Sequence, residues 1–356
     1  MTLTTVPLAL ATQFGTGGDF TGTRPALQTV VFPDSTSYQF QYDSYGQITS
    51  ITLPTGGQIT YGYTNTTPPN SVNRWLTSRM DSAGNSWTFS PVVNSCTAPC
   101  NPLTVTVTTP PYSDGTTTAS DNHVYSFFFA VPNGGGGAWL AQVQYFRGAA
   151  SGTPLLTLTK EYNNGQNNAC QQPMGNALVP VLIRETLAWP SGSGTLSKKA
   201  EYCYDSNGIN LITKKLWDYQ PNGSFAAAPD READTTYVTD PAYVNANILQ
   251  LPLTITTLGP GGVQMAKTTY AYDGGSLQPA NITTNHTTPA GPRGNLSSVS
   301  KWLNTTGGSI SSSTNWYDTG ELYQSIDPLG HTTTFSYDAA FAGAYLTQAC
   351  NALSPT

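Results

Sequence analysis

The fold is decided by the stretch Tyr42-Asp43-Ser44-Tyr45-Gly46-Gln47-Ile48, which recurs near the other end of the sequence as Tyr317-Asp318-Thr319-Gly320-Glu321-Leu322. In both stretches a tyrosine–aspartate pair precedes a glycine, and an aliphatic residue follows two positions after that glycine. An aspartate side chain can accept a hydrogen bond from the backbone two residues on, and glycine adopts the positive φ that closes a tight turn. The pattern therefore predicts a hairpin corner, in which the tyrosine ends one strand and the aliphatic residue begins the next.

Degenerate copies of this corner occur along the sequence at a regular spacing. Tyr42 to Tyr63 spans 21 positions and Tyr317 to Tyr337 spans 20, each interval holding a second, glycine-centred turn. A fixed period of this length indicates a repeat in which each unit is two strands and two turns. We assign the structural repeat motif to Tyr42, Asp43, Gly46, Tyr204, Asp205, Gly208, Tyr272, Asp273, Tyr317, Asp318, Gly320, Asp327, Gly330, Tyr337 and Asp338.

The sequence predicts an all-β protein built as a hairpin meander that forms a long twisted sheet, a wrapped shell or a solenoid-like strip. The only helical element that we expect is a short turn over 226–234. Four segments follow one another in what we expect to be one continuous β architecture. They are an N-terminal strand segment (1–35), hairpin repeats (36–90), a divergent β region with longer loops (91–200) and hairpin repeats again (201–356).

The tyrosine–aspartate corners, the turn Asp327-Pro328-Leu329-Gly330 and the lead-in Arg293-Gly294-Asn295-Leu296 resemble the YD repeats of bacterial RHS proteins, which are related to animal teneurins. The resemblance is clearest over 36–90 and 265–340 and fainter over 100–265. It implies a β-sheet strip that spirals into a hollow shell, often around a C-terminal toxin, in proteins that are secreted or displayed at the cell surface. The sequence lacks the core segment that precedes the toxin in that family and is much shorter than a complete shell. We therefore expect a fragment or a compact relative.

The composition favours an extracellular or cell-surface β protein. Only 10% of the residues are charged, and 34 glycines and 26 prolines are spread between short strand-like runs. The net charge of -6 and the scattered Lys and Arg residues argue against a nucleic-acid partner. No run approaches the roughly 18 apolar residues of a membrane span, and the first residues lack the basic region of an export signal. Export would then require a signal that was removed or lies upstream.

The five cysteines allow at most two disulfides within the chain. We expect Cys96 to pair with Cys100 around a small loop, and Cys170 to pair with Cys203. Cys350 is then left over.

A search for catalytic or metal-binding patterns identifies no site. A glycosidase needs two carboxylates that face each other across a cleft, and sequence spacing cannot pair the available acids. The candidates for such a pair are Glu161, Glu185, Glu201, Asp230, Glu232 and Glu321. His123, His286 and His331 lack the spacing of metal ligands, and the sequence has no nucleophile elbow and no phosphate-binding loop. We therefore expect no enzymatic activity, no catalytic residue, no cofactor and no metal.

The leading hypothesis is a non-enzymatic structural protein whose sheet serves as a shell wall or as a self-assembling, filament-like subunit. The unpaired edges of an uncharged repeat sheet favour self-association, and the segments 3–14 and 344–353 are the expected edge strands. One alternative is a carbohydrate-binding or adhesin module with a glycan or cell-surface partner, in which Trp139, Trp189, Trp217 or Trp302 would stack on sugars. A second alternative is a segment of a toxin-enclosing shell.

Overall fold

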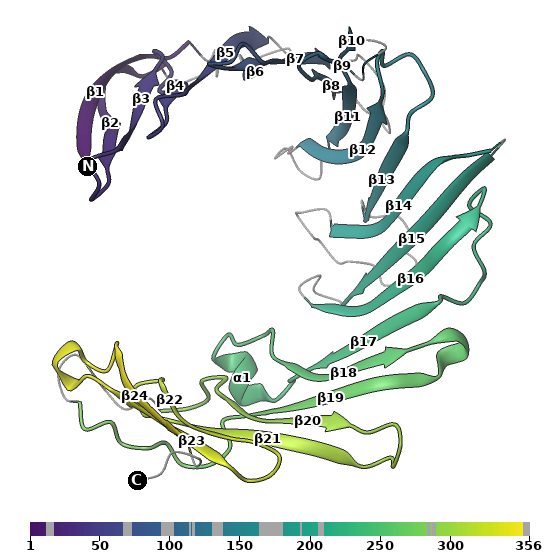
Figure 1. Ribbon diagram of the computed structural model, residues 1–356. Helices are drawn as coiled ribbons and strands as arrows, with labels where there is room; N and C mark the ends of the chain where they lie inside the picture. Colours follow the sequence, from purple (N-terminus) through teal and green to yellow (C-terminus); the bar gives the residue numbers. More distant parts are fainter. Residues whose placement is uncertain are drawn as a thin grey trace. The chain divides into compact units, whose positions relative to one another are not determined.

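The computed structural model describes residues 1–11, 18–66, 73–93, 103–113, 115, 118–129, 138–163, 181–192, 194–205, 210–282, 286 and 290–351. They form an antiparallel sheet of 22 strands and a separate hairpin of two short strands (Figure 1). The prediction of an all-β meander is confirmed, because the strands of the sheet pair with their neighbours along the chain, apart from β8, which pairs with β11.

Contacts divide the chain into two compact units, which we describe separately. Unit 1 comprises residues 1–161, 185–197 and 221–223, and unit 2 comprises 162–184, 198–220 and 224–356. Within the first 163 residues the strands are β1 (Thr2–Ala9), β2 (Thr21–Val31), β3 (Ser37–Tyr42), β4 (Ile48–Thr52), β5 (Gln58–Thr66), β6 (Asn73–Asp81), β7 (Ser86–Val93), β8 (Leu103–Thr108), β9 (Tyr112–Ser113), β10 (Thr118–Ala119), β11 (Asn122–Phe129), β12 (Ala138–Phe146) and β13 (Leu156–Asn163). The short β9–β10 hairpin lies outside the sheet, so β8 pairs with β11.

The remaining elements continue the meander. They are β14 (Val181–Ser191), β15 (Gly194–Tyr204), β16 (Leu211–Pro221), β17 (Arg231–Tyr237), α1 (Pro241–Asn245), β18 (Pro252–Leu258), the single-turn η1 (Pro260–Gly262), β19 (Gln264–Tyr272), β20 (Leu296–Trp302), β21 (Ser309–Trp316), β22 (Leu322–Ile326), β23 (Thr332–Tyr337), the single-turn η2 (Ala339–Phe341) and β24 (Leu346–Asn351). None of the helices in this described part of the chain has the length and hydrophobicity needed to cross a bilayer.

The prediction of a helical turn over 226–234 is wrong. Residues 231–234 belong to β17, which pairs with β16 on one side and with β18 on the other, so ladder hydrogen bonds on both sides hold this segment extended. The helix lies a few residues later, as α1. There Asp240 caps the first turn by accepting a hydrogen bond from the Ala242 N–H (2.8 Å), and Pro241 occupies the first helical position, where its missing N–H is not needed.

The hydrophobic core is thin. The buried apolar side chains are Val6, Leu103, Val143 and Phe146 in unit 1 and Ile183, Cys203 and Trp217 in unit 2. Most sheet residues are accordingly only half-buried. Each unit is therefore a sheet whose faces remain largely open.

Candidate functional site

The corner between β3 and β4 shows how the repeat motif closes a turn. The Asp43 Oδ1 atom accepts hydrogen bonds from the backbone N–H groups of Tyr45 (2.9 Å) and Gln47 (3.0 Å). Gly46 has a φ of 76°, a conformation that glycine adopts without steric cost. The carboxylate thus satisfies two backbone donors inside its own turn.

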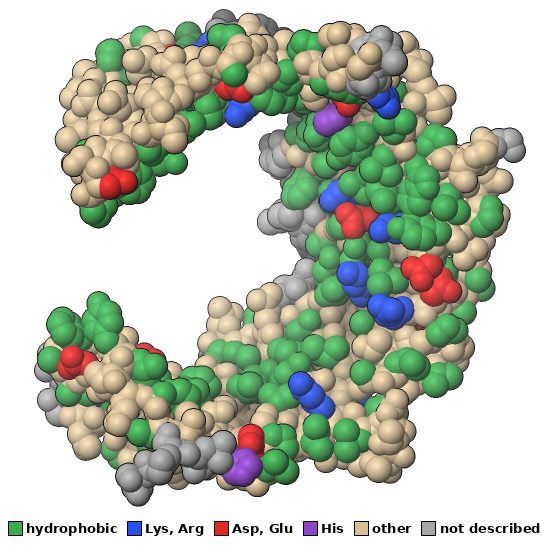
Figure 2. Space-filling model, viewed as in Figure 1, with side chains coloured by type: hydrophobic (Ala, Val, Ile, Leu, Met, Phe, Trp, Pro, Cys, Tyr) green, Lys and Arg blue, Asp and Glu red, His purple; other side chains and the backbone are tan. Residues whose placement is uncertain are grey.

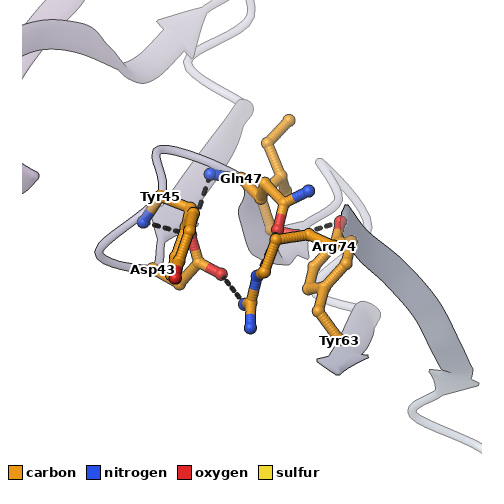
Figure 3. Close-up of polar contacts among 6 residues, drawn as sticks. Asp43, Tyr45, Gln47, Tyr63 and Arg74 are labelled. Atoms are coloured by element: carbon orange, nitrogen blue, oxygen red, sulfur yellow. Dashed lines mark hydrogen bonds and ion pairs between the residues drawn. The ribbon is translucent and has the colours of Figure 1, made fainter. Parts of the chain in front are cut away.

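Arg74 ties this corner to the next hairpin (Figure 3). It extends from β6, forms an ion pair with the other carboxylate oxygen of Asp43, and donates from Nε to the Gln47 side chain (3.1 Å). Its guanidinium lies 4.4 Å from the centroid of the Tyr45 ring and 5.7 Å from that of Tyr63. The corner is therefore a cross-link between successive repeat units, built from one cation between two rings and a carboxylate.

The aspartate of the second clear copy of the motif has a different partner. The corner at Tyr317 closes through backbone hydrogen bonds and a Gly320 φ of 97°. Asp318, however, accepts its hydrogen bond from the Ala280 N–H (2.9 Å), 38 positions earlier in the chain. Its second oxygen lies 3.5 Å from Nε2 of His286. Here the carboxylate fixes the long connection between β19 and β20 instead of its own turn.

Asp273 is also bound to a segment far away in the sequence. Its carboxylate accepts from three consecutive backbone N–H groups, those of Arg293 (2.9 Å), Gly294 (2.8 Å) and Asn295 (2.9 Å). The Tyr243 hydroxyl forms a further hydrogen bond with this carboxylate. Burial, followed by this hydrogen bond, raises the pKa of Tyr243 to about 12. Asp273 therefore holds the end of the long β19–β20 connection in place.

An aromatic residue at or near the end of a strand recurs along the chain. A register shift, the mark of a β-bulge, immediately precedes each of six such residues. They are Tyr42, Tyr63, Tyr237, Tyr272, Trp316 and Tyr337. The first four donate their hydroxyl to a backbone carbonyl of the preceding strand, at 2.6 to 3.1 Å. Sequence reasoning missed Tyr237 and Trp316, because no aspartate directly follows them.

Two further aspartates, Asp327 and Asp81, act in turns that lack the bulged aromatic, whereas Asp338 directly follows the bulged Tyr337. Asp327 accepts from the N–H groups of Leu329 (2.8 Å) and His331 (2.9 Å), and Asp81 makes the equivalent pair of hydrogen bonds with Ala83 and Asn85 (both 3.0 Å). Asp338 accepts from the Ala340 N–H (2.7 Å) at the start of η2. Gly330, like Gly46, has a positive φ (89°). Tyr204 and Asp205 lie at the end of β15, and Gly208 lies outside the described residues.

The acidic side chains on the strands take part in ion pairs. Glu201, which is 8% exposed, lies 3.0 Å from both Arg184 and Lys199, and the Lys199 ammonium is 3.7 Å from the centroid of the Trp217 ring. Lys160 pairs with Glu185 (3.0 Å) and Lys215 with Glu232 (3.7 Å). Figure 2 shows charges of both signs intermixed with apolar side chains over the central strands. In the described part of the chain, no group of three or more His, Cys, Asp or Glu side chains is arranged to hold a metal ion.

Of the four predicted disulfide partners only Cys203 lies among the described residues, and one of the four tryptophans proposed to stack on sugars is buried. Cys203 is buried in β15 and disulfide-bonded, whereas Cys96, Cys100 and Cys170 lie outside the described residues. Cys350 is free and exposed. Trp217 is 5% exposed and donates from Nε1 to the Ala226 carbonyl (2.8 Å), so its ring packs inside the sheet.

Comparisons with known proteins return structures but no sequence relatives. No protein-family model and no curated protein sequence matches the chain. A structure of TcdB2-TccC3 without its hypervariable C-terminal region is similar over 86% of this chain and 22% of that chain, at 8% identity and a TM-score of 0.49. A Photorhabdus luminescens Tc holotoxin pore is similar over 89% and 17% (14% identity, TM-score 0.24), and a porin-like protein from Bacteroides uniformis over 80% and 91% (12% identity, TM-score 0.24). The chain thus spans less than a quarter of the two toxin chains.

Proposed function

We propose that this chain is a non-enzymatic extracellular structural protein, a repeat-sheet wall that associates with a second copy of itself through its C-terminal edge strand. The observation that carries the proposal is β24. All six residues of this strand are exposed and none is charged or proline. Among the described residues, β24 pairs with β23 on one side and with no strand on the other. Such an edge presents unpaired backbone donors and acceptors that another strand can complete.

The backbone groups that point away from β23 follow from the register. Alternate residues of an antiparallel strand direct their backbone groups toward opposite neighbours. The Asp327 N–H donates to the His331 carbonyl (3.0 Å), so the backbone groups of these two residues point toward each other. By alternation from His331, the backbone groups of Thr333 point toward β22 and those of Thr334 point toward β24. Because Thr334 lies opposite Cys350, the backbone of Cys350 points inward. The backbone groups of Ala349 therefore point outward.

The N-terminal edge is less suited to strand addition. The Ala9 N–H donates to the Ser44 carbonyl (2.8 Å), so this residue directs its backbone away from β2. Pro7 has the same orientation by alternation and offers no N–H. On the outer side of β1 the Ala9 N–H is therefore already hydrogen-bonded, and Pro7 has no N–H to offer. A pairing of β24 with β24, which closes as a two-fold dimer, is favoured over an open filament that would need both edges.

The interactions of the acidic side chains also support a structural role as a wall. The strand-borne acids pair with neighbouring bases, and the motif aspartates bind backbone N–H groups in their own turns or in distant connections. The half-buried faces of the sheet support a second form of the same function. In that form the sheet covers a guest polypeptide, as the YD-repeat resemblance implies for toxin-enclosing shells.

A proline at a position whose backbone groups point away from β23 tests whether β24 forms the dimer contact. Ala349→Pro removes a donor that faces away from β23, so we expect the dimer to be lost while the melting temperature is unchanged. Ser82→Pro is the matched control, because it copies the Pro328 of the equivalent turn in a place remote from β24. Sedimentation velocity over a concentration series, with reductant present because Cys350 is exposed and free, measures the monomer and dimer fractions.

The expected result is a wild-type dimer fraction that rises with concentration, matched by Ser82→Pro and absent in Ala349→Pro. Ala349→Asp is a second variant that keeps all backbone donors and opposes like charges across the two-fold axis. A wild-type chain that stays monomeric throughout the series, or a dimer that both Ala349 variants leave intact, overturns the proposal.

A further inference from the structure

Unit 2 contains a hollow of about 280 Å³ beside the end of β15 and under α1. Asp205 and Asn210 line it where β15 leads into β16, and Tyr237 lines it from the end of β17. Ile212, Val244 and Leu249 supply apolar walls. The hollow therefore combines an apolar body with a small polar end, the usual composition of a small-ligand site.

Asn210 leaves an acceptor unused at the polar end. The side chain is buried (9% exposed), and its amide nitrogen donates to the Asp205 carboxylate (2.9 Å) and to the Leu249 carbonyl (3.0 Å). Both of these partners are acceptors, so the amide cannot be turned around, and its oxygen must be the free end. That Oδ1 atom is buried without a hydrogen-bond donor. A buried carbonyl in this state is stabilised by a ligand that brings an N–H or O–H group.

Three of the donors around the hollow are already in use, and the Thr239 hydroxyl, which also lines it, can donate or accept. The Tyr237 hydroxyl donates to the Leu211 carbonyl (3.1 Å). Burial, and then the nearby Asp205 carboxylate, raises the pKa of Tyr237, so the hydroxyl stays protonated and keeps this role. The Asp205 and Val238 N–H groups donate to the carbonyls of Asn210 and Leu251 (both 2.9 Å). The lining thus offers acceptors, which suits a ligand that is rich in donors.

We propose that this hollow binds an alkylammonium group, that is, a primary amine on a short aliphatic chain. The ammonium carries three N–H donors, which the Asn210 carbonyl and the Asp205 carboxylate accept. The methylene groups pack against Ile212, Val244 and Leu249, and the Tyr237 ring adds an aromatic surface beside the cation. A sugar fits less well, because its hydroxyls also require donors from the protein. The source is a free alkylamine or the lysine side chain of a polypeptide.

Ligand-observed saturation-transfer NMR on the full chain tests the site with n-butylamine and with n-butanol, which has the same length and no charge. We expect saturable binding of n-butylamine that is at least tenfold tighter than that of n-butanol. Nα-acetyl-lysine-N′-methylamide, compared with its norleucine counterpart, shows whether a lysine side chain is accepted. Binding of n-butylamine without the lysine derivative assigns the site to free amines.

Two variants distinguish binding of the amine in the hollow from nonspecific attraction of cations to an acidic protein. Asp205→Asn keeps an oxygen that can accept from Asn210 and removes the charge, and we expect at least tenfold weaker amine binding. Val244→Trp, at a position that is 45% exposed, fills the hollow from α1 and should abolish binding. Asp230→Asn removes one negative charge elsewhere in unit 2 and should bind like wild type. Equal affinity for n-butylamine and n-butanol, or wild-type binding by Asp205→Asn, overturns the proposal, and neither result bears on β24 pairing.

Discussion

The corners at Asp43 and Asp273 begin with the same tyrosine–aspartate pair, yet the two carboxylates have different partners. Asp43 binds N–H groups two and four residues ahead and pairs with Arg74 of a neighbouring strand. Asp273 binds three consecutive N–H groups that are 20 to 22 residues ahead. The first carboxylate shapes a turn, whereas the second anchors a connection.

The residues after the aspartate explain this difference. Asp43 is followed by two ordinary residues before Gly46, so the chain can fold back over its own carboxylate. Asp273 itself has a φ of 52° and is followed directly by Gly274 and Gly275, so the chain turns away before a local hydrogen bond can form. A side chain at Gly274 would collide with Ser297 of β20, at 2.9 Å from its hydroxyl. The dipeptide therefore marks a strand end, and the position of the glycine decides what the carboxylate binds.

The largest effect is expected at the remote anchor. Asp273→Ala leaves three backbone N–H groups and the Tyr243 hydroxyl without their acceptor. Hydrogen bonds to a charged group are the strong ones, so we expect unit 2 to lose about 3 kcal/mol of stability. Hydrogen–deuterium exchange should show faster exchange at residues 293–295 and unchanged exchange at the Asp43 corner. Uniform protection at 293–295 in this variant would show that the anchor is dispensable.

Acid titration provides the control for this variant. Burial alone would raise the pKa of Asp273, but the hydrogen bonds from Arg293, Gly294, Tyr243 and Asn295 together hold it below its usual value. A carboxylate with a lowered folded-state pKa contributes stability above the unfolded value of about 3.9, and that contribution is lost as the pH falls through the folded value. Wild type should therefore lose stability below about pH 4. Asp273→Asn should be less stable at neutral pH and should show a weaker loss in that acid range.

A smaller effect is expected at the local turn. Asp43→Ala removes two hydrogen bonds inside one turn and the ion pair with Arg74, whose side chain is 20% exposed. We expect a loss of about 1.5 kcal/mol in urea unfolding. Arg74→Met keeps the turn and the contact with the rings, so the double variant should show coupling through the ion pair alone. Additive single effects would mean that Arg74 does not tie the corner to β6.

The sequence was sufficient for the fold because the repeat is local. The turns at Asp43, Asp81 and Asp327 close through hydrogen bonds within five residues. The prediction of a helical turn over 226–234 failed because local composition does not encode strand pairing. Residues 231–234 are held extended by hydrogen bonds to β16 and β18.

The non-local partners of the motif could not be predicted. The segments that Asp273 and Asp318 bind lie 20 or more positions away, and nothing in the tyrosine–aspartate pair encodes that distance. The unused carbonyl of Asn210 likewise depends on the Leu249 carbonyl, 39 positions later. A search for aromatic residues at strand ends, without the requirement for aspartate, would have found Tyr237 and Trp316 from the sequence.

The smallest effect is expected at the feature that both corners share. Tyr42 donates to the Leu27 carbonyl (2.6 Å) and Tyr272 to the Pro252 carbonyl (2.8 Å), each directly after a bulge. Each Tyr→Phe variant removes one neutral hydrogen bond and keeps the ring, so both should lose about 1 kcal/mol in urea unfolding. Tyr345→Phe, at a ring that is 62% exposed, should change nothing. If Tyr272→Phe costs as much as Asp273→Ala while Tyr42→Phe costs little, the tyrosines also differ in role. Equal losses would mean that the bulged aromatic is the constant element of the repeat and that the aspartate is the part free to vary.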